Sequence, residues 1–487
     1  MTTSKHALSK SAFIRGWQCH KALYLYKKRY YLRDKLTPER LVKFKRGTNI
    51  GLIARDLFPE GVDASPSTPF QYAKSVAYTQ SLISQNTNTI YEAAFVYNGV
   101  LAALDILAYQ DGKWYGYEVK SSLAISETYL MDAALQYYVI TGSGLKLDGF
   151  FIIYMNEDYV LNSEPKLNEL FIQQNVTKDI LKLQSFVQQE IEEQLVVIKL
   201  DKSPAIDIGT YCDYPYPCDF KGHCWKRVPQ NSVFKLQWLD ELQKFDLYYK
   251  GILIPDNIPY DFLTDPVQIR KLKAHKENIV LTNKAALKDF LGKRNQQLCF
   301  LRVWYHKPAL PLFDGLKPYE QLPFFISSGI LGEKDIKMEI NHYLLEPDIN
   351  PLIQFRQILS DVAAKCNCIV TFNDKEVRLI YDELASSSPE INPVSFIDLE
   401  NILSLNYYYD PIFFGQSDIL DIAAHFNNEL AKEKVLSDAE AILEYNEAVA
   451  NLPEAASFMN KIKKSSDQYL ISIRSFYNFL HDILETD

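Results

Sequence analysis

Residues 104–122 have the sequence LDILAYQDGKWYGYEVKSS, and the organisation of the first half of the chain follows from this segment. Two runs rich in β-forming residues flank Asp111-Gly112, a dipeptide that strongly favours a tight hairpin turn. Glu118 and Lys120 are two residues apart, so they point to the same face, and the hairpin returns Asp105 toward them. Burying two carboxylates and an ammonium group in an apolar sheet is unfavourable unless a cation or an anionic substrate neutralises them. The hairpin therefore predicts a functional site.

The composition indicates a globular protein with two or three domains. The chain has 487 residues, of which 47% are hydrophobic and 13% aromatic. No apolar run reaches the roughly 18 residues that a membrane span needs, so we expect no membrane association. The N-terminus lacks the apolar core of a signal peptide, which predicts a cytoplasmic protein. Seven cysteines without such a signal argue against a disulfide framework.

Positive charge is concentrated at the N-terminus, although the formal net charge of the chain is −9. Residues 1–50 contain thirteen Lys or Arg against two acidic residues, Asp34 and Glu39. Cations interleaved with aromatic rings suit the backbone and bases of a single-stranded nucleic acid. A solvated helix with an aromatic core face explains the same pattern equally well. The interleaved aromatic residues are Phe13, Trp17, Tyr24, Tyr26, Tyr30, Tyr31 and Phe44.

Alternation of predicted helices and strands around the hairpin indicates an α/β core. In the first half we predict a helix over 40–58 with a kink or break near Gly47, helices over 72–82, 129–140 and 176–199, and strands over 90–97 and 150–155. In the second half we predict helices over 233–249, 267–276, 351–365 and 375–385, strands over 298–305, 322–326 and 368–372, and a helical acidic end.

The hairpin and the following helix carry a resemblance. Asp105, then Glu118-x-Lys120 after a short turn, then a helix bearing Gln136 resemble the core of the PD-(D/E)xK nuclease superfamily, specifically its RecB-like branch. The segments around Lys10, Trp17 and Gly47 are similar to the same branch. Two features depart from it: Ile140 replaces an aromatic residue, and a metal-binding His is missing from the first helix. Glu92, on the strand before the hairpin, is the nearest substitute for the missing His.

The resemblance implies a catalytic set of Asp105, Glu118, Lys120 and Gln136. Asp105, Glu118 and the Val119 carbonyl are expected to hold one or two Mg²⁺ or Mn²⁺ ions, with Glu92 as a further ligand. Such an ion activates water and neutralises charge on the scissile phosphate, while Lys120 orients the water or stabilises developing charge. The alternative is a salt-bridge patch on an exposed sheet face.

Cys212, Cys218 and Cys224 lie within thirteen residues, in a loop rich in proline. Three thiols leave a four-thiolate centre one ligand short, and Cys19 is the obvious fourth. Structural zinc usually takes closer cysteine pairs, although His20 and His223 could also serve it. One N-terminal cysteine plus a C-terminal trio resembles the iron–sulfur nucleases, including CRISPR-associated exonucleases and AddB-type nucleases, which favours a 4Fe-4S cluster over zinc. Three buried thiols without a metal are the remaining alternative. The other cysteines, Cys299, Cys366 and Cys368, are most simply core residues.

The second half resembles a bacterial protein group of unassigned function that joins a RecB-like nuclease to an RNase H-like, DnaQ-type exonuclease fold. Sites of that type begin with acid-x-acid on the first strand, where this chain has Arg302 and Trp304. Neither side chain ligates Mg²⁺, so we expect a catalytically inactive domain. The predicted domains are a nuclease domain over 1–229 closed by the four cysteines, a helical connector over 230–296 and the RNase H-like domain over 297–487.

Two functions therefore remain. The first is a metal-dependent deoxyribonuclease that acts on single-stranded DNA or DNA ends. The second is an inactive nucleic-acid-binding or scaffold subunit with protein partners in DNA repair or antiviral defence. The retained trio of Asp105, Glu118 and Lys120 favours the first, because a drifting site would be expected to lose at least one of them.

Overall fold

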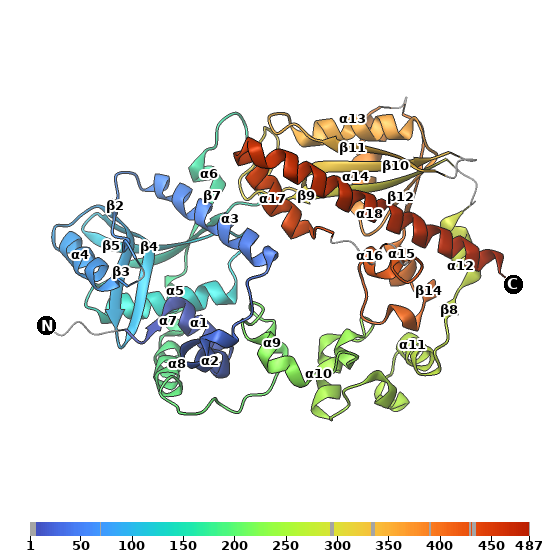
Figure 1. Cartoon of the computed structure of the whole chain (residues 1–487). Helices are drawn as coiled ribbons and strands as arrows, with labels where there is room; N and C mark the ends of the chain where they lie inside the picture. Colours follow the sequence, from blue (N-terminus) through green and yellow to red (C-terminus); the bar gives the residue numbers. More distant parts are fainter. Residues whose placement is uncertain are drawn as a thin grey trace. The chain divides into compact units, whose positions relative to one another are not determined.

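The computed structural model of the chain describes residues 6–68, 70–292, 297–332, 337–388, 391–427, 430 and 435–486. The chain forms two compact units of mixed α/β structure, which confirms the predicted class (Figure 1). Unit 1 comprises residues 1–227 and 308–320, and unit 2 comprises residues 228–307 and 321–487. The prediction placed the whole of 297–487 in one domain, whereas residues 308–320 lie in unit 1 because they pack into its core.

Unit 1 is built on a seven-stranded mixed sheet. The strand order is β2-β3-β4-β5-β6-β7, with the short β1 paired in parallel to β4. Strands β3, β4 and β5 form an antiparallel meander, and β6 runs parallel to β5 after a crossover through helix α5. The strands span Leu8–Ser9 (β1), Val62–Asp63 (β2), Thr89–Tyr97 (β3), Val100–Gln110 (β4), Lys113–Lys120 (β5), Gly149–Met155 (β6) and Phe171–Asn175 (β7).

The β4–β5 hairpin turns at Asp111 and Gly112, which both have positive φ angles, of 51° and 76°. Two successive positive φ values are characteristic of the tight hairpin turn that the Asp-Gly dipeptide predicted. Pairing between the two strands extends from Gln110–Lys113 to Ile106–Tyr117 and stops there. Beyond this point β4 stays paired with β3, and β5 stays paired with β6. Asp105 and Glu118 therefore lie where the two strands diverge, at a position we call the fork.

Helices pack around this sheet, and α5 lies against the strands of the meander (Figure 1). The apolar core includes Phe13, Leu104, Leu135, Phe150 and Ile191. Helix α3 continues through Gly47, so a break, one of the two predicted alternatives, is not present there. The prediction of a single helix over 176–199 was wrong, because this segment is divided at Leu183. The helices span Lys10–Gln18 (α1), His20–Lys28 (α2), Pro38–Ala54 (α3), Tyr72–Ser84 (α4), Glu127–Gly142 (α5), Leu167–Leu170 (α6), Thr177–Lys182 (α7), Gln184–Val197 (α8) and Lys221–Cys224 (α9).

Unit 2 contains a five-stranded sheet in the order β11-β10-β9-β12-β13. Strands β9, β10 and β11 are antiparallel, whereas β12 and β13 run parallel to β9. Side chains of β9 alternate between two cores, so that Phe300 and Trp304 share one with α18 while Leu301 and Val303 share the other with α13. The strands span Leu298–His306 (β9), Leu322–Leu331 (β10), Glu339–Leu344 (β11), Cys368–Thr371 (β12) and Ser395–Asp398 (β13).

Three helices of unit 2 follow the predictions, at Pro266–Glu277, Pro351–Ala363 and Lys375–Ser387. The helix at Lys284–Leu291 was not predicted, and the helix predicted over 233–249 differs near residue 233. Val233–Lys235 forms a separate 3₁₀ turn, and α10 begins at Glu241 after an Asp240 capping box. The cysteines Cys299, Cys366 and Cys368 are buried, as expected of core residues. The main helices span Glu241–Tyr249 (α10), Pro266–Glu277 (α11), Lys284–Leu291 (α12), Pro351–Ala363 (α13), Lys375–Ser387 (α14), Glu400–Ser404 (α15), Ile419–Ala423 (α16), Asp438–Ala450 (α17) and Leu452–Glu485 (α18).

Candidate functional site

Glu118 is the centre of the candidate site at the fork and is only 1% exposed. Its Oε1 accepts hydrogen bonds from the ammonium groups of Lys10 and Lys120, both at 2.7 Å. Its Oε2 accepts a hydrogen bond from Gln136 Nε2 at 2.8 Å. Burial acts to raise the pKa of Glu118, but the two lysines outweigh it and hold the pKa below its ordinary value. Glu118 is therefore a buried, ionised carboxylate.

The two lysines are shared with a second acid, Asp132 of α5. Asp132 Oδ2 lies 2.5 Å from Lys120 Nζ and 3.7 Å from Lys10 Nζ. Burial acts to lower the lysine pKa values, but the carboxylates of Asp132 and Glu118 reverse this and raise both. The raised pKa values favour the protonated form of both lysines, in which they are cationic hydrogen-bond donors.

Gln136 lies one helical turn after Asp132, so the two side chains share a face of α5. Both are buried in an otherwise apolar helix, and Gln136 Nε2 lies 3.4 Å from Asp132 Oδ1. Among the residues that the structure describes, none donates a hydrogen bond to the buried Gln136 Oε1. A buried amide oxygen without a partner is unfavourable, and it leaves one acceptor available at the fork.

Asp105 is the second carboxylate of the fork. Its Oδ2 accepts a hydrogen bond of 2.6 Å from the Val119 amide, which joins the diverging strands. Burial, together with the charge of Glu118, raises the pKa of Asp105 to about 7. Metal-free Asp105 is thus only partly ionised near neutral pH, and a bound cation would favour its charged form.

Glu92 faces Asp105 across the β3–β4 pair, because Tyr91 pairs with Ile106 and Ala93 pairs with Leu104. Its φ of 52° is uncommon for a residue with a side chain and interrupts the regular strand. The carboxylate lies 3.5 Å from Arg55. Burial raises the pKa of Glu92 despite the opposing charge of Lys10. Glu92, with its unusual backbone conformation, therefore lies on strand β3, next to the fork.

The structure brings together Asp105, Glu118, Lys120 and Gln136, and adds two residues that sequence reasoning missed as site members. Lys10 arrives from α1, which packs against α5, so no local spacing connects it to Glu118. Asp132 had a signal that was overlooked. It is the acid four residues before Gln136 in a helix whose buried positions are otherwise almost all apolar.

The four candidate cysteines lie around one cavity. Cys19, at the junction of α1 and α2, lines it together with Cys212, Cys218 and Cys224. Burial raises the pKa of Cys218 to about 12 and also raises the pKa values of Cys19 and Cys224. A metal that binds these thiols must displace protons from them.

The spacing of the four thiols is wide for a single ion. A tetrahedral zinc site with Zn–S bonds of about 2.3 Å brings its sulfur atoms to within about 3.8 Å of one another. Among the described residues, one set of three or more His, Cys, Asp or Glu ligand atoms lies within 4.8 Å of one another, and it contains no cysteine. Every set of three of these thiols therefore includes at least one pair of sulfur atoms more than 4.8 Å apart, which is wider than a single zinc ion holds its ligands.

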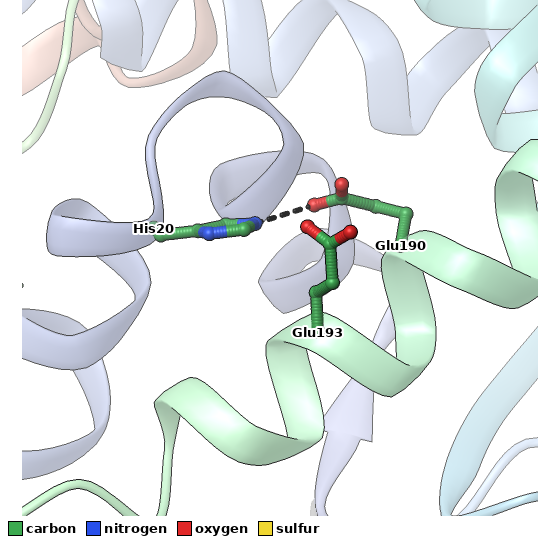
Figure 2. A group of neighbouring side chains, drawn as sticks. All are labelled: His20, Glu190 and Glu193. Atoms are coloured by element: carbon green, nitrogen blue, oxygen red, sulfur yellow. Dashed lines mark hydrogen bonds and ion pairs between the residues drawn. The ribbon is translucent and has the colours of Figure 1, made fainter.

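That one set is His20, Glu190 and Glu193, where α2 meets α8 (Figure 2). His20 Nε2 lies 3.0 Å from Glu190 Oε1, which also accepts a hydrogen bond of 2.8 Å from Gln194. His20, an alternative zinc ligand in the sequence, is thus engaged by Glu190. We interpret the group as a contact that fixes α2 against α8 beside Cys19.

Part of the basic N-terminal stretch is used inside unit 1. Arg15, Arg33 and Arg40 converge on Asp219 in the cysteine loop, at 2.5, 3.2 and 2.5 Å. Burial acts to raise the pKa of Asp219, but the arginines lower it overall. Gln18 donates hydrogen bonds to the carbonyls of Tyr211 and Tyr216, at 2.8 and 2.7 Å. These contacts attach the N-terminal helices to the loop that carries three of the cysteines.

In unit 2, the two positions where paired acids were expected hold Arg302 and Trp304, and both side chains contact other residues of the unit. Arg302 forms an ion pair with Asp438 and lies over the rings of Trp304 and Tyr469. Trp304 is fully buried and donates a hydrogen bond of 2.8 Å to Ser466. The Asp398 carboxylate accepts three backbone hydrogen bonds, from residues 373, 374 and 400.

Comparison with known proteins gives one partial match. A family model described as a domain of unknown function, DUF2779, matches residues 305–418. The matched region extends from the end of β9 to the start of α16. A search of curated proteins finds no match. Within the described residues, no helix combines the length and apolar character needed to cross a membrane.

Proposed function

We propose that this chain is a metal-dependent deoxyribonuclease of the PD-(D/E)xK type, RecB-like branch, that hydrolyses single-stranded DNA or DNA ends. The observation that carries the proposal is the convergence of Asp105, Glu118, Lys120 and Gln136 at the fork. An exposed salt-bridge patch does not account for it, because Glu118 is buried and two lysines share it. A site that binds and cleaves a phosphodiester would account for this convergence of buried charged residues.

Asp105, Glu118 and the Val119 carbonyl are the groups that would hold Mg²⁺ or Mn²⁺, with Glu92 close by on β3. Their chemistry fits, since hard cations prefer carboxylate and carbonyl oxygens. The raised pKa of Asp105 and the partnerless Gln136 Oε1 both indicate a site short of positive charge or donors. A bound ion supplies an activated water and neutralises charge on the scissile phosphate.

The side chains of the chain then have separate tasks. Lys120, protonated at neutral pH, would donate to the phosphate oxygens or orient the attacking water. Lys10 offers a second ammonium group within reach of the same carboxylate. Asp132 and Gln136 hold Lys120 and Glu118 in place, because their own positions are fixed on the buried face of α5.

The four cysteines would hold a 4Fe-4S cluster, with zinc as the alternative. The thiol donor set suits both, but the absence of any three thiols within 4.8 Å of one another favours the larger group. A cluster there would supply a covalent cross-link between the N-terminal helices and the segment after α8, where Arg15 and Gln18 already make contacts.

Unit 2 would be a degenerate RNase H-like domain without activity. Its strand order, with three antiparallel strands followed by two parallel ones, supports the fold expectation. Arg302 and Trp304 support inactivity, because a guanidinium and an indole replace the acids that would bind metal. The domain would then serve as a platform for DNA or a protein partner in repair or defence.

The test is incubation of labelled single- and double-stranded DNA with Mn²⁺ and the full-length chain. We expect cleavage by the wild type and by Asp179→Ala, which removes an exposed carboxylate on α7. Glu118→Ala and Lys120→Ala should abolish it while leaving the circular dichroism spectrum unchanged. Wild-type cleavage by both of these variants would overturn the assignment. Cleavage that survives Glu118→Ala and is lost in Asp398→Ala would place the activity in unit 2.

A nucleic-acid-binding or scaffold role is the other outcome of the same experiment. It predicts binding of single-stranded DNA without cleavage under any metal condition. Separate measurement of binding by fluorescence anisotropy distinguishes the two outcomes.

A further inference from the structure

Residues 308–320 belong to unit 1, although the residues on either side of them in the sequence belong to unit 2. They lie within the connection between β9 and β10, whose ends are paired through His306 and Leu322. The same residues belong to the compact body of unit 1. We call this segment the strap.

The strap is joined to unit 1 by hydrogen bonds with residues 161–163. The Gly315 amide donates to the Leu161 carbonyl at 2.9 Å, and the Leu161 amide donates to the Leu316 carbonyl at 3.0 Å. The Asp314 side chain accepts a hydrogen bond of 2.7 Å from the Ser163 amide. This reciprocal backbone pairing resembles a short piece of sheet more than an incidental surface contact.

Apolar residues of the strap complete a core of unit 1. Ala309 is 6% exposed and lies in the cluster that contains Ile106, Tyr117 and Ile153. Leu310 and Tyr319 pack against this cluster. Ile106 and Tyr117 are the last pair of the β4–β5 hairpin before the fork. The strap therefore contributes to the packing directly behind the candidate site.

Tyr319 brings the strap to the end of β5. Its hydroxyl donates a hydrogen bond of 2.5 Å to the carbonyl of Ser121, the residue after Lys120. The Arg46 guanidinium lies 5.0 Å from the centre of the Tyr319 ring. Tyr319 has a φ of 61°, which is unusual for a bulky side chain and is maintained only where the surroundings enforce it.

We propose that the strap positions the β5 end that carries Lys120, and that Tyr319 is the positioning residue through its bond to the Ser121 carbonyl. The proposal rests on the nuclease function and deepens it. Residues 121–125 connect β5 to α5 without regular secondary structure, so their path depends on individual contacts. One such contact is the bond from the Met155 amide to the Ser122 carbonyl at 2.9 Å, and Tyr319 supplies another.

The physical basis is the precision that Lys120 needs. Its ammonium group is held by Glu118 at 2.7 Å and Asp132 at 2.5 Å. A shift of the strand end by a fraction of an ångström would weaken this geometry, and small misplacements of a reacting group lower catalytic rates strongly. The strap thereby makes the N-terminal site dependent on a segment encoded almost 200 residues later.

The test compares Tyr319→Phe with Tyr381→Phe in the full chain. Tyr381 is a matched control outside the fork, because its hydroxyl also donates a hydrogen bond of 2.5 Å to a backbone carbonyl, that of Asn392. Each variant loses one hydrogen bond from a tyrosine hydroxyl to a backbone carbonyl. We expect Tyr319→Phe to lower kcat for single-stranded DNA at least about fivefold with little change in KM. Tyr381→Phe should leave kcat within about twofold of the wild type.

A second readout does not depend on activity. Hydrogen–deuterium exchange should become faster in the peptide covering residues 119–125 in Tyr319→Phe, and stay unchanged there in Tyr381→Phe. Unchanged exchange in both variants would overturn the proposal, and so would faster exchange with an unchanged kcat. A wild type that cleaves nothing refutes the nuclease function, whereas the exchange result still reports whether the strap holds the end of β5.

Discussion

Replacing Asp105 with Asn should make the metal-free protein less sensitive to alkaline pH. In the folded chain the pKa of Asp105 is raised from 3.8 to about 7, mainly by burial and by the charge of Glu118. A group whose folded pKa is raised contributes stability at low pH that is lost as the pH rises through the folded pKa. The wild type should therefore lose stability as Asp105 ionises, and the Asp105→Asn variant should lose less.

The size of the effect follows from the two pKa values. The linkage relation with pKa values of 3.8 and about 7 gives a loss of about 2 kcal/mol between about pH 5.5 and about pH 8. The ionisation of Asp105 is coupled to that of Glu118, and this coupling reduces the expected loss of folding stability toward about 1 kcal/mol. The substitution keeps an oxygen that can accept the 2.6 Å hydrogen bond from the Val119 amide. It removes the ionisation without removing that contact.

The assay is urea unfolding of both proteins at the two pH values, in EDTA and with equal occupancy of the cysteine site. Between the lower and the higher pH, the free energy of unfolding should fall by about 1–2 kcal/mol more in the wild type than in Asp105→Asn. Asp179→Asn, an exposed carboxylate control, should follow the wild type. Added Mn²⁺ should stabilise the wild type at the higher pH and not Asp105→Asn. Parallel losses in wild type and Asp105→Asn would refute the argument that Asp105 is the crowded carboxyl of the fork.

Three further substitutions test other parts of unit 1. Asp132→Asn, which removes the negative partner of Lys120, should lower kcat at least about tenfold with the fold intact, as measured by steady-state cleavage and circular dichroism. Cys212→Ser should lower bound iron and visible absorbance after anaerobic purification; a colourless wild type that carries zinc instead would contradict the cluster. Gly16→Ala should destabilise unit 1 by about 1–3 kcal/mol in urea, because its Cβ would lie 2.3 Å from the side-chain amide carbon of Gln194, which is fully buried and held by hydrogen bonds to the Phe13 carbonyl and Glu190. Gly51→Ala, where a Cβ meets nothing within 4 Å, is its control and should not be destabilised.

The parts of the fold that could be predicted from sequence depend on local rules. The Asp111-Gly112 turn requires two positive φ angles, so it fixed the hairpin and with it the return of Asp105 toward Glu118. Strand periodicity placed Glu118 and Lys120 on one face. Strands β11 and β13 were not predicted, because Glu339–Leu344 and Ser395–Asp398 are short and are not purely apolar.

The parts that could not be predicted depend on tertiary packing. Lys10 lies 108 residues from Glu118 and reaches it only because α1 packs against α5. The three arginines that meet Asp219 belong to the stretch for which nucleic-acid binding and a solvated helix were equal alternatives, since nothing local indicates a buried partner about 180–200 residues away. The strap was missed for the same reason. Its sequence contains turn residues, but its position in unit 1 depends on contacts with residues 121 and 161–163.

The strap also has a consequence for synthesis of the chain on the ribosome. The residues of the fork are complete once Gln136 has been made, but Ala309 and Tyr319 follow much later. At about 5–20 residues per second, roughly 10–40 s of translation separate the two events. During this interval the cluster around Ile106 lacks its last apolar side chains and the Ser121 carbonyl lacks its donor. Unit 1 therefore acquires these contacts only after the strap has been made, and a truncated product that ends before the strap would have the site residues without them.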